Sequence, residues 1–273
     1  MKGMRLTYPL PLLSRMLGVS SSGYYGWVDR PLSRRAQEEI RLELEIKVAH
    51  HRTRQTYGPE RLQGDLAENG IQVGICRIRR IRKKLGLRCK QKKKFKVTTD
   101  SRHKLPVTEN LLKQQFKVYE PDKVWVSDIT YVPTDEGWLY LAGHKDLFIV
   151  EIVGYAIGER MIRNLIGQSL LRALSIRRPE KGLLHHSLME NYGLEASMSG
   201  SGNCYDNAPM ESFCGILKQE LVHHRHYHTR REAIAEITEY IEIFYNRQRL
   251  QAGLGYLSPA AYARKYYSGL VAA

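Results

Sequence analysis

The sequence predicts an α/β domain preceded by an all-α basic region. Positive charge is confined to the first part of the chain, because residues 1–117 hold 27 Lys and Arg against 10 Asp and Glu, whereas residues 118–273 hold 16 against 18. Helical apolar spacing dominates the first part, and period-two alternation opens the second. A chain of 273 residues is long enough for two cores. We expect a helical region over 1–97, a linker over 98–122 and the α/β domain over 123–268.

The uneven charge is typical of a polyanion-binding module joined to a near-neutral domain. A solvated basic face that serves only solubility is the alternative. The sequence has no apolar run long enough for a membrane span, and its N-terminus lacks the apolar core of a signal peptide. Its four cysteines form no CxxC pair and are too few for a disulfide framework. We therefore expect a cytoplasmic protein with reduced thiols and no membrane partner.

Two short helices are expected between residues 57 and 86. Pro59 suits the first turn of a helix that Gly70 would end, and a second helix over residues 75–85 places isoleucines on one stripe. Two helices joined by a tight turn predict a helix-turn-helix whose second helix enters the major groove. The residues expected to contact DNA are the basic ones of this second helix: Arg77, Arg79, Arg80, Arg82, Lys83 and Lys84. Such binding should be strongly salt-dependent.

Upstream, the sequence predicts another small helix-turn-helix around Gly18 and a charged helix over residues 33–51. Its inward face is expected to carry Ile40, Leu44 and Val48.

Two sets of histidines raise the question of metal binding. His50 and His51 could join Cys76 and Cys89 in a zinc site, but adjacent histidines and cysteines 13 positions apart fit zinc-finger spacing poorly. The cluster HHRHYH, residues 223–228, follows a predicted helix end. Contact with the helix dipole, solvent or DNA is favoured there over a metal.

The second part begins with strand signals. After a linker with Pro106 and Pro121, KVWVSDITYVP alternates as a strand does. GWLYLAGHKDLF and IVEIVGYAIG follow as two more strands, MIRNLIGQSLLRALSIRR as a helix, and GLLHHS as a strand. Three strands, a helix and a strand predict a ribonuclease-H-like α/β sheet with a helical crossover.

Two carboxylates are notable in this part. Asp128 lies in the middle of the first strand, where an unpaired carboxylate is costly to bury and so needs a metal or a cation. Glu211 lies in the helix of DNAPMESFCGILKQELV, beside its apolar stripe and on one face with Gly215 and Lys218. Taken alone, Glu211 is more typical of a first-turn acid that favours the helix dipole. The stripe itself is expected to bury Met210, Phe213, Leu217 and Leu221.

The last long helix, EAIAEITEYIEIFYNRQR, is expected to bury four apolar residues, and the two arginines at its end are expected to contact DNA. The apolar residues are Ile234, Ile237, Ile241 and Phe244, and the arginines are Arg247 and Arg249.

WVSDITYV, LYLAGHKDLFIVEIVGYAI, GNCYDNAPMESFCGILKQELV and YNRQRLQAGLGYLSPAAY resemble the integrase-type transposases encoded by the second reading frame of many bacterial insertion sequences. The resemblance covers nearly the whole chain. It implies an integrase catalytic core with an Asp, Asp, Glu triad that holds two Mg²⁺ or Mn²⁺ ions. Asp128 and Glu211 would be its first and last members, both as catalytic residues and as metal ligands, with Lys218 near the DNA phosphate.

The same resemblance implies a set of partners. These are double-stranded DNA at element ends and target, further copies of the chain assembled on DNA, and a protein from the upstream reading frame. It also implies association with the bacterial nucleoid.

The chain departs from the family at the second acid. The family's second Asp follows a His-Ser pair in a stretch resembling HSDRGSQY, whereas here His186 and Ser187 are followed by Leu188. The family's interval from this Asp to the Glu is also longer, by about a dozen residues, than the interval from Leu188 to Glu211. We infer an internal deletion that removed the Asp. Losing one of three anionic ligands should weaken metal binding and impair catalysis.

Other acids could replace the missing ligand only from different backbone positions. Glu190, Asp146 and Asp206 are the candidates, but a displacement of about 1 Å can cost a hundredfold in rate. We therefore expect no effective replacement.

Other departures lie in the predicted strands. Gly143, His144 and Lys145 stand where the family has apolar β-branched residues, and Glu151 replaces a basic one. Polar residues in a core strand are expected to destabilise it.

The sequence supports three functional hypotheses. The first is a DNA strand transferase of the transposase type, a polynucleotidyl transferase by family, whose catalysis is impaired in this copy. The second is a non-catalytic DNA-binding remnant that holds element ends or regulates an intact transposase. The third is a nuclease of the same fold, since fold alone does not select the reaction.

Overall fold

The computed structural model describes residues 2–90, 112, 115–160, 163–186, 195–197 and 207–271. It divides into two compact units, Met1–Val48 and Ala49–Ala273, which are described separately. The boundaries expected from the sequence, at residues 97 and 122, remain a prediction.

The first unit contains the 3₁₀ turn η1 (Lys2–Met4), the helices α1 (Leu10–Leu17) and α2 (Ser21–Val28), and most of α3 (Arg34–Arg52). The helix pair expected around Gly18 is present. Gly18 ends α1 in the left-handed conformation at φ 66°, which glycine adopts without strain. Ser20 caps α2 by accepting the Gly23 N–H.

The charged helix α3 is also present, but its predicted inward face is wrong. Ile40, Leu44 and Val48 are 55%, 62% and 48% exposed. The buried face carries Leu42, Ile46 and Ala49 instead. This second row has the same helical spacing, so periodicity alone could not choose between the two.

The second unit begins with the predicted helix-turn-helix, formed by α4 (Pro59–Glu68) and α5 (Ile75–Lys84). Leu62 and Leu66 of α4 and Ile78 and Ile81 of α5 are fully buried. Because these residues lie at i, i+4 and i, i+3, each helix presents one apolar stripe to the core and leaves its other face for polar side chains.

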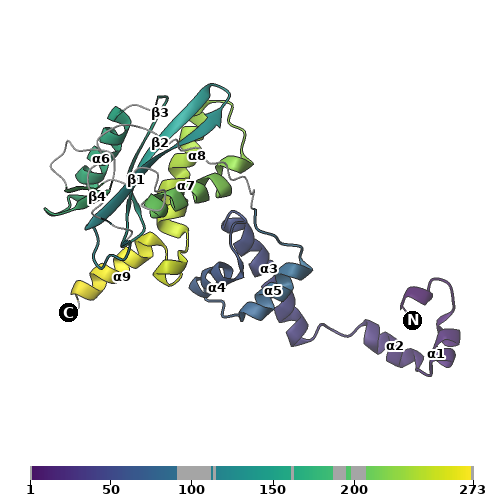
Figure 1. Ribbon diagram of the computed structural model, residues 1–273. Coiled ribbons are helices and arrows are strands. Elements are labelled where there is room, and N and C mark those ends of the chain that lie inside the picture. Colours follow the sequence, from purple (N-terminus) through teal and green to yellow (C-terminus); the bar gives the residue numbers. More distant parts are fainter. Residues whose placement is uncertain are drawn as a thin grey trace. The chain divides into compact units, whose positions relative to one another are not determined.

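A five-stranded sheet follows, with the strand order β3-β2-β1-β4-β5 (Figure 1). β1 (Val124–Thr134), β2 (Gly137–Asp146) and β3 (Ile152–Gly158) form an antiparallel meander. After α6 (Arg163–Arg177), β4 (Leu184–His186) returns parallel to β1, and β5 (Glu195–Ser197) pairs parallel to β4. The predicted sequence of three strands, a helix and a strand is confirmed.

Helices cover the two faces of this sheet. Successive residues of a strand point to opposite faces. His144 of β2 meets Ser169 of α6, whereas a Cβ added at the neighbouring Gly143 would meet Met210 of α7 (Ala208–Glu220). The sheet is therefore enclosed between α6 and α7, as Figure 1 also shows.

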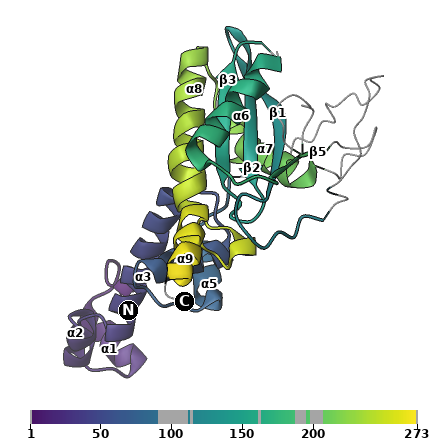
Figure 2. The ribbon, with the colours of Figure 1, turned by 90° about the vertical axis from the view of Figure 1, so that its left-hand side faces the viewer.

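The remaining chain builds a long rod and a terminal helix. After η3 (Val222–His224), α8 (Arg230–Glu239) continues directly into the π-helical segment η4 (Tyr240–Gln248), and Figure 2 shows them as one rod beside the sheet. η5 (Ala252–Leu254) and α9 (Pro259–Val271) complete the fold. Within the described residues, no helix has the length and apolarity to cross a membrane.

The rod buries most of its predicted stripe, namely Ile237, Ile241 and Phe244. Ile234 is an exception, since it is 38% exposed while its neighbour Ala233 is fully buried. The prediction for Ile234 was wrong because the buried stripe of α8 begins one residue earlier.

The polar residues that depart from the family pattern, His144 and Lys145 of β2 and Glu151 just before β3, have partners. His144 Nδ1 lies 2.9 Å from His185 Nε2, and its Nε2 lies 2.7 Å from Ser169 Oγ. Lys145 Nζ donates to the Pro209 carbonyl at 3.0 Å. Arg177 Nη2 lies 3.5 Å from Glu151 Oε2. We expected these residues to destabilise the strands, because buried polar groups without partners are costly. The contacts above supply partners, so that reason does not apply.

Candidate active site

Asp128 lies on the face of β1 that α7 covers. Val126 and Val124, two and four residues before it, share this face, whereas Trp125 and Ile129 pack with α6-side residues. Its Oδ1 accepts the Ile129 N–H at 2.8 Å. Burial, and then the charge of Glu211, raise the pKa of Asp128 to about 6, although the Ile129 N–H and the charge of Lys218 oppose this rise.

Three contacts hold the first turn of α7 against β1 and β2. Asn207, at the N-cap position, makes no cap bond with its side chain and instead donates from Nδ2 to the Ser127 carbonyl at 3.0 Å. Lys145 donates to Pro209 from the neighbouring strand. At Gly143, which pairs with Asp128, an added Cβ would lie only 2.8 Å from Met210 Cε, so the missing side chain allows the helix to approach.

Glu211 and Lys218 extend from the helix so positioned. Glu211 lies in the first turn with much of its side chain in solvent, and the burial of the remaining part raises its pKa. Lys218 lies two turns later, with Nζ 4.5 Å from the centre of the Tyr131 ring, a cation–π distance. The charges of both residues act on Asp128. The three predicted site residues are therefore close enough for the charges of Glu211 and Lys218 to shift the pKa of Asp128.

The donor set of this site fits a hard divalent cation. Asp128 and Glu211 offer only carboxylate oxygens, the ligands that Mg²⁺ and Mn²⁺ prefer. Burial and, as a smaller cause, the charge of Glu211 raise the pKa of Asp128, and a bound cation would offset the repulsion from Glu211. Cys214, the nearby thiol, is buried, and burial raises its pKa, so it is not a reactive ligand.

Asp146 does not join this site. It pairs with Trp125, three residues before Asp128 in β1, and its side chain accepts N–H groups from Asp122, Phe148 and Ile149 at 2.6 to 2.8 Å. Its carboxylate therefore serves to stabilise the connection between β2 and β3. Glu190, Asp206 and the junction between Ser187 and Leu188 lie outside the described residues.

Comparison with known proteins identifies the chain. Residues 36–95 match the model of an HTH-like domain, and residues 211–266 match that of an integrase core domain. The chain is 56% identical over 268 residues to the Insertion element IS600 uncharacterized 31 kDa protein of Shigella sonnei, covering 93% of this chain and 98% of that one. It is 34% identical to Transposase InsF for insertion sequence IS3A of Escherichia coli K12, covering 94% and 95%. It is 37% identical to the Transposase for insertion sequence element IS904 of Lactococcus lactis IL1403, covering 88% and 99%.

The chain belongs to the insertion-sequence transposases. The predicted family and fold class, an integrase core preceded by a helix-turn-helix region, are both confirmed.

The transposase presents part of its basic helix α5 to solvent. Arg79, Arg80, Lys83 and Lys84 are exposed, while Arg77 and Arg82 are half-buried. Within the protein, Arg79 Nη2 lies 2.8 Å from Glu60 Oε1, and Arg82 donates to Cys89 Sγ at 3.3 Å. Near the C-terminus, Arg247 is exposed.

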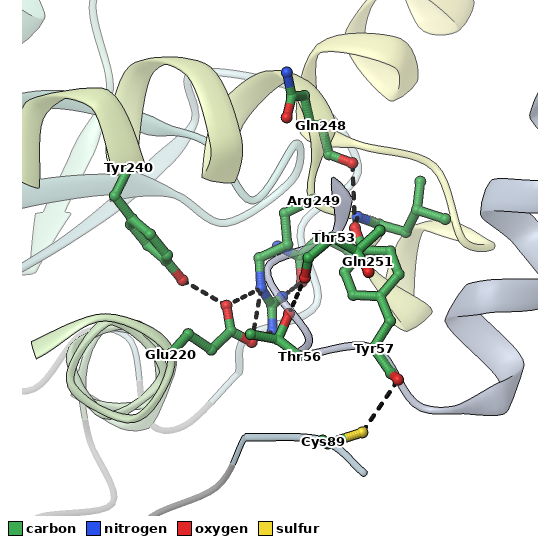
Figure 3. A network of polar contacts seen from close by, with 10 residues as sticks. Thr53, Thr56, Tyr57, Cys89, Glu220, Tyr240, Gln248, Arg249 and Gln251 are labelled. Atoms are coloured by element: carbon green, nitrogen blue, oxygen red, sulfur yellow. Dashed lines mark hydrogen bonds and ion pairs between the residues drawn. The ribbon is translucent and has the colours of Figure 1, made fainter. Parts of the chain in front are cut away.

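Arg249 requires a correction, because its side chain is only 2% exposed and does not face a DNA surface. Figure 3 shows its guanidinium directed at Glu220, with Nε and Nη2 within 3.2 Å of the carboxylate oxygens. Nη1 donates to Gln251, and the Tyr240 hydroxyl donates to Glu220 at 2.7 Å. Sequence reasoning missed Glu220 because this acid lies 29 residues from Arg249 and on another helix.

The same network joins the helix-turn-helix to the core of the transposase (Figure 3). The buried Tyr57 hydroxyl accepts the Leu250 N–H at 2.7 Å and donates to the Gln248 carbonyl at 3.3 Å. Cys89 Sγ donates to the Tyr57 carbonyl. The segment that leads into α4 is thereby fixed to the end of the long rod.

The zinc site considered for His50, His51, Cys76 and Cys89 is not assembled. In the part of the chain that the structure describes, the one group of three or more such residues close enough to share an ion is Asp135, His226 and His228.

Proposed function

We propose that this transposase holds the ends of its insertion element through α4 and α5, and that Asp128 and Glu211 are the metal ligands of its strand-transfer site. The convergence of Asp128 and Glu211 beside Lys218 is the observation that carries the proposal. Their all-oxygen donor set favours Mg²⁺ or Mn²⁺. When bound, two such ions would supply activation of an attacking hydroxyl and stabilisation of the leaving oxygen of a phosphodiester.

The chain's own residues prepare this site. Asp128 must be ionised to act as a ligand, and its pKa of about 6 means that metal binding releases a proton from part of the population near neutral pH. Lys218, held over Tyr131, would place its ammonium next to a phosphate bound between the two acids. Arg79, Arg80, Lys83 and Lys84 of α5, together with Arg247, would position the duplex through its phosphates.

The site is proposed to be impaired. The family motif around His186 and Ser187 lacks its Asp in this sequence, which leaves two carboxylates where the family has three. Two negative charges offset two divalent ions less well than three, so occupancy and geometry should both suffer. This departure also favours the second candidate function, a non-catalytic protein that holds element ends or regulates an intact transposase. We extend the proposal to double-stranded DNA as the partner, with further copies of the chain and an upstream-frame protein joining the complex.

The test is a cleavage and strand-joining assay with Mg²⁺ or Mn²⁺, on DNA that carries the ends of the encoding element. We expect end binding without efficient joining. Reinserting a segment of about a dozen residues with its Asp after Ser187 should raise joining, and Asp128→Asn in that restored chain should abolish it.

Each outcome of this assay decides between the hypotheses. Robust joining by the present chain would contradict the impairment, and joining that survives Asp128→Asn would contradict the site. Cleavage without joining and without preference for element ends would instead support the nuclease hypothesis.

A further inference from the structure

A second group of metal-ligating side chains lies away from Asp128 and Glu211. Asp135, in the turn between β1 and β2, faces His226 and His228 from the connection that precedes α8. His226 Nε2 lies 3.0 Å from Asp135 Oδ1, and His228 Nδ1 lies 2.9 Å from Asp135 Oδ2. The three ligand atoms lie within 4.8 Å of one another, and all three residues are exposed.

The backbone on both sides of this group is fixed by hydrogen bonds. Asp135 N donates to the Tyr227 carbonyl at 3.0 Å, between the two histidines. The Tyr227 side chain is buried, so His226 and His228, its two neighbours, are directed outward. From the other side, Arg230 N donates to Glu136 Oε2 at 2.7 Å.

The start of α8 fixes His228 itself. Thr229 caps the helix by accepting the Glu232 N–H, and Glu232 accepts the His228 N–H at 3.1 Å in return. This reciprocal pair resembles a capping box. The hydrogen bonds described above therefore hold the backbone that carries the three ligands, which lowers the entropic cost of binding an ion.

The spacing of the donor atoms suits a tetrahedral ion of the zinc class. Zn²⁺ binds imidazole nitrogen at about 2.0–2.1 Å and carboxylate oxygen at about 2.0–2.2 Å, so tetrahedral ligands lie roughly 3.4 Å apart. The two nitrogen–oxygen distances, 2.9 and 3.0 Å, are close to this value. The ligand nitrogens of the two histidines lie within 4.8 Å of each other, and rotation of these exposed side chains permits the closer approach that a shared ion requires.

We propose that Asp135, His226 and His228 form a binding site for a borderline-soft divalent cation such as Zn²⁺. Two imidazoles and one carboxylate leave the fourth tetrahedral position to water. The donor set differs from the all-oxygen set of Asp128 and Glu211, so the two sites select different metals. The bound ion would cross-link the β1–β2 turn to the start of α8.

The experiment is equilibrium dialysis of chelator-treated full-length chain against Zn²⁺, with thermal unfolding as a second measurement. The double variant H226Q/H228Q removes both nitrogen ligands. His51→Gln is the matched control, because His51 is also exposed and also has a polar partner, the Gln55 side chain. The control shows whether replacing an exposed histidine elsewhere in the chain also changes zinc binding.

We expect one zinc ion per chain to be lost in the double variant, with affinity lower by about tenfold or more, and no change in the control. Zinc should raise the melting temperature of the unsubstituted chain and the control, but not of the double variant. Equal zinc affinity in the unsubstituted chain and the double variant would overturn the proposal, as would an equal loss in the control. Asp135→Asn gives the same comparison through the third ligand if the double variant does not fold.

Discussion

Replacing Asp128 by Asn should stabilise the protein at neutral pH. The pKa of Asp128 rises from an ordinary value of 3.8 to about 6 in the folded chain, so the folded state disfavours the ionised carboxylate. The carboxylate of Asp128 therefore lowers the free energy of unfolding most above pH 6, where it is ionised in both the folded and the unfolded chain. The cost is absent below about pH 3.8, grows through the interval and is complete above the folded pKa.

The magnitude follows from the shift between the two pKa values. Each unit corresponds to about 1.4 kcal/mol, so the full cost is at most about 3 kcal/mol at pH 7.5, and about half of that at pH 5. Asn keeps the shape of the side chain and an oxygen to accept the Ile129 N–H. The gain in stability from Asp128→Asn should therefore increase by about 1.5 kcal/mol between pH 5 and pH 7.5.

The assay is urea unfolding of both chains at these two pH values in the presence of a chelator. Glu180→Gln serves as the control, because Glu180 is an exposed carboxylate that pairs with Lys123 at 3.7 Å, and such a surface pair contributes little. Adding Mg²⁺ at pH 7.5 should stabilise the unsubstituted chain more than Asp128→Asn. If the gain in stability from Asp128→Asn does not grow with pH, the claim that burial disfavours the ionised carboxylate is refuted.

Three further outcomes are expected. Arg249→Met should lower the free energy of unfolding by about 3–5 kcal/mol in urea titrations, because it leaves the charge of Glu220 unpaired; a loss under 1 kcal/mol would contradict the buried pair. Gly154→Ala should cost about 1–3 kcal/mol in the same measurement, since its Cβ would lie 2.7 Å from backbone atoms of α6, whereas Gly143→Ala meets only a flexible side-chain end and should cost less. Lys83→Ala should reduce the slope of log affinity against log salt by about one in DNA-binding titrations, and an unchanged slope would argue against a phosphate contact.

Local patterns were sufficient to predict most of the elements. The alternation around Asp128 predicted β1, and the stripe through Met210 and Phe213 predicted the buried face of α7. These predictions succeed because burial imposes a period of two on strands and 3.6 on helices. Convergence of Asp128 and Glu211 was expected only through the family resemblance, because no local pattern relates residues on a strand and a distant helix.

The errors concern choices that depend on distant residues. Helix α3 has two apolar rows, and the row through Ile40 is exposed although its period is correct. Arg249 follows the exposed Arg247 and was expected to contact DNA, but tertiary pairing with Glu220 buries it. His144 was expected to be costly, and its partner His185 lies 41 residues away in the sequence. Pairing of polar side chains across elements leaves no periodic signal.

Stability and the proposed activity depend on different residues of this transposase. The core depends on apolar stripes and on satisfied polar groups such as His144, none of which requires the family's second Asp. The carboxylate of Asp128 itself opposes folding, so a further acid beside it would add repulsion in the absence of metal. On the proposed function, removing that acid would leave the fold intact and would weaken the attraction for cations. A well-formed fold in this chain is for that reason compatible with a site that binds DNA and fails at the chemical step.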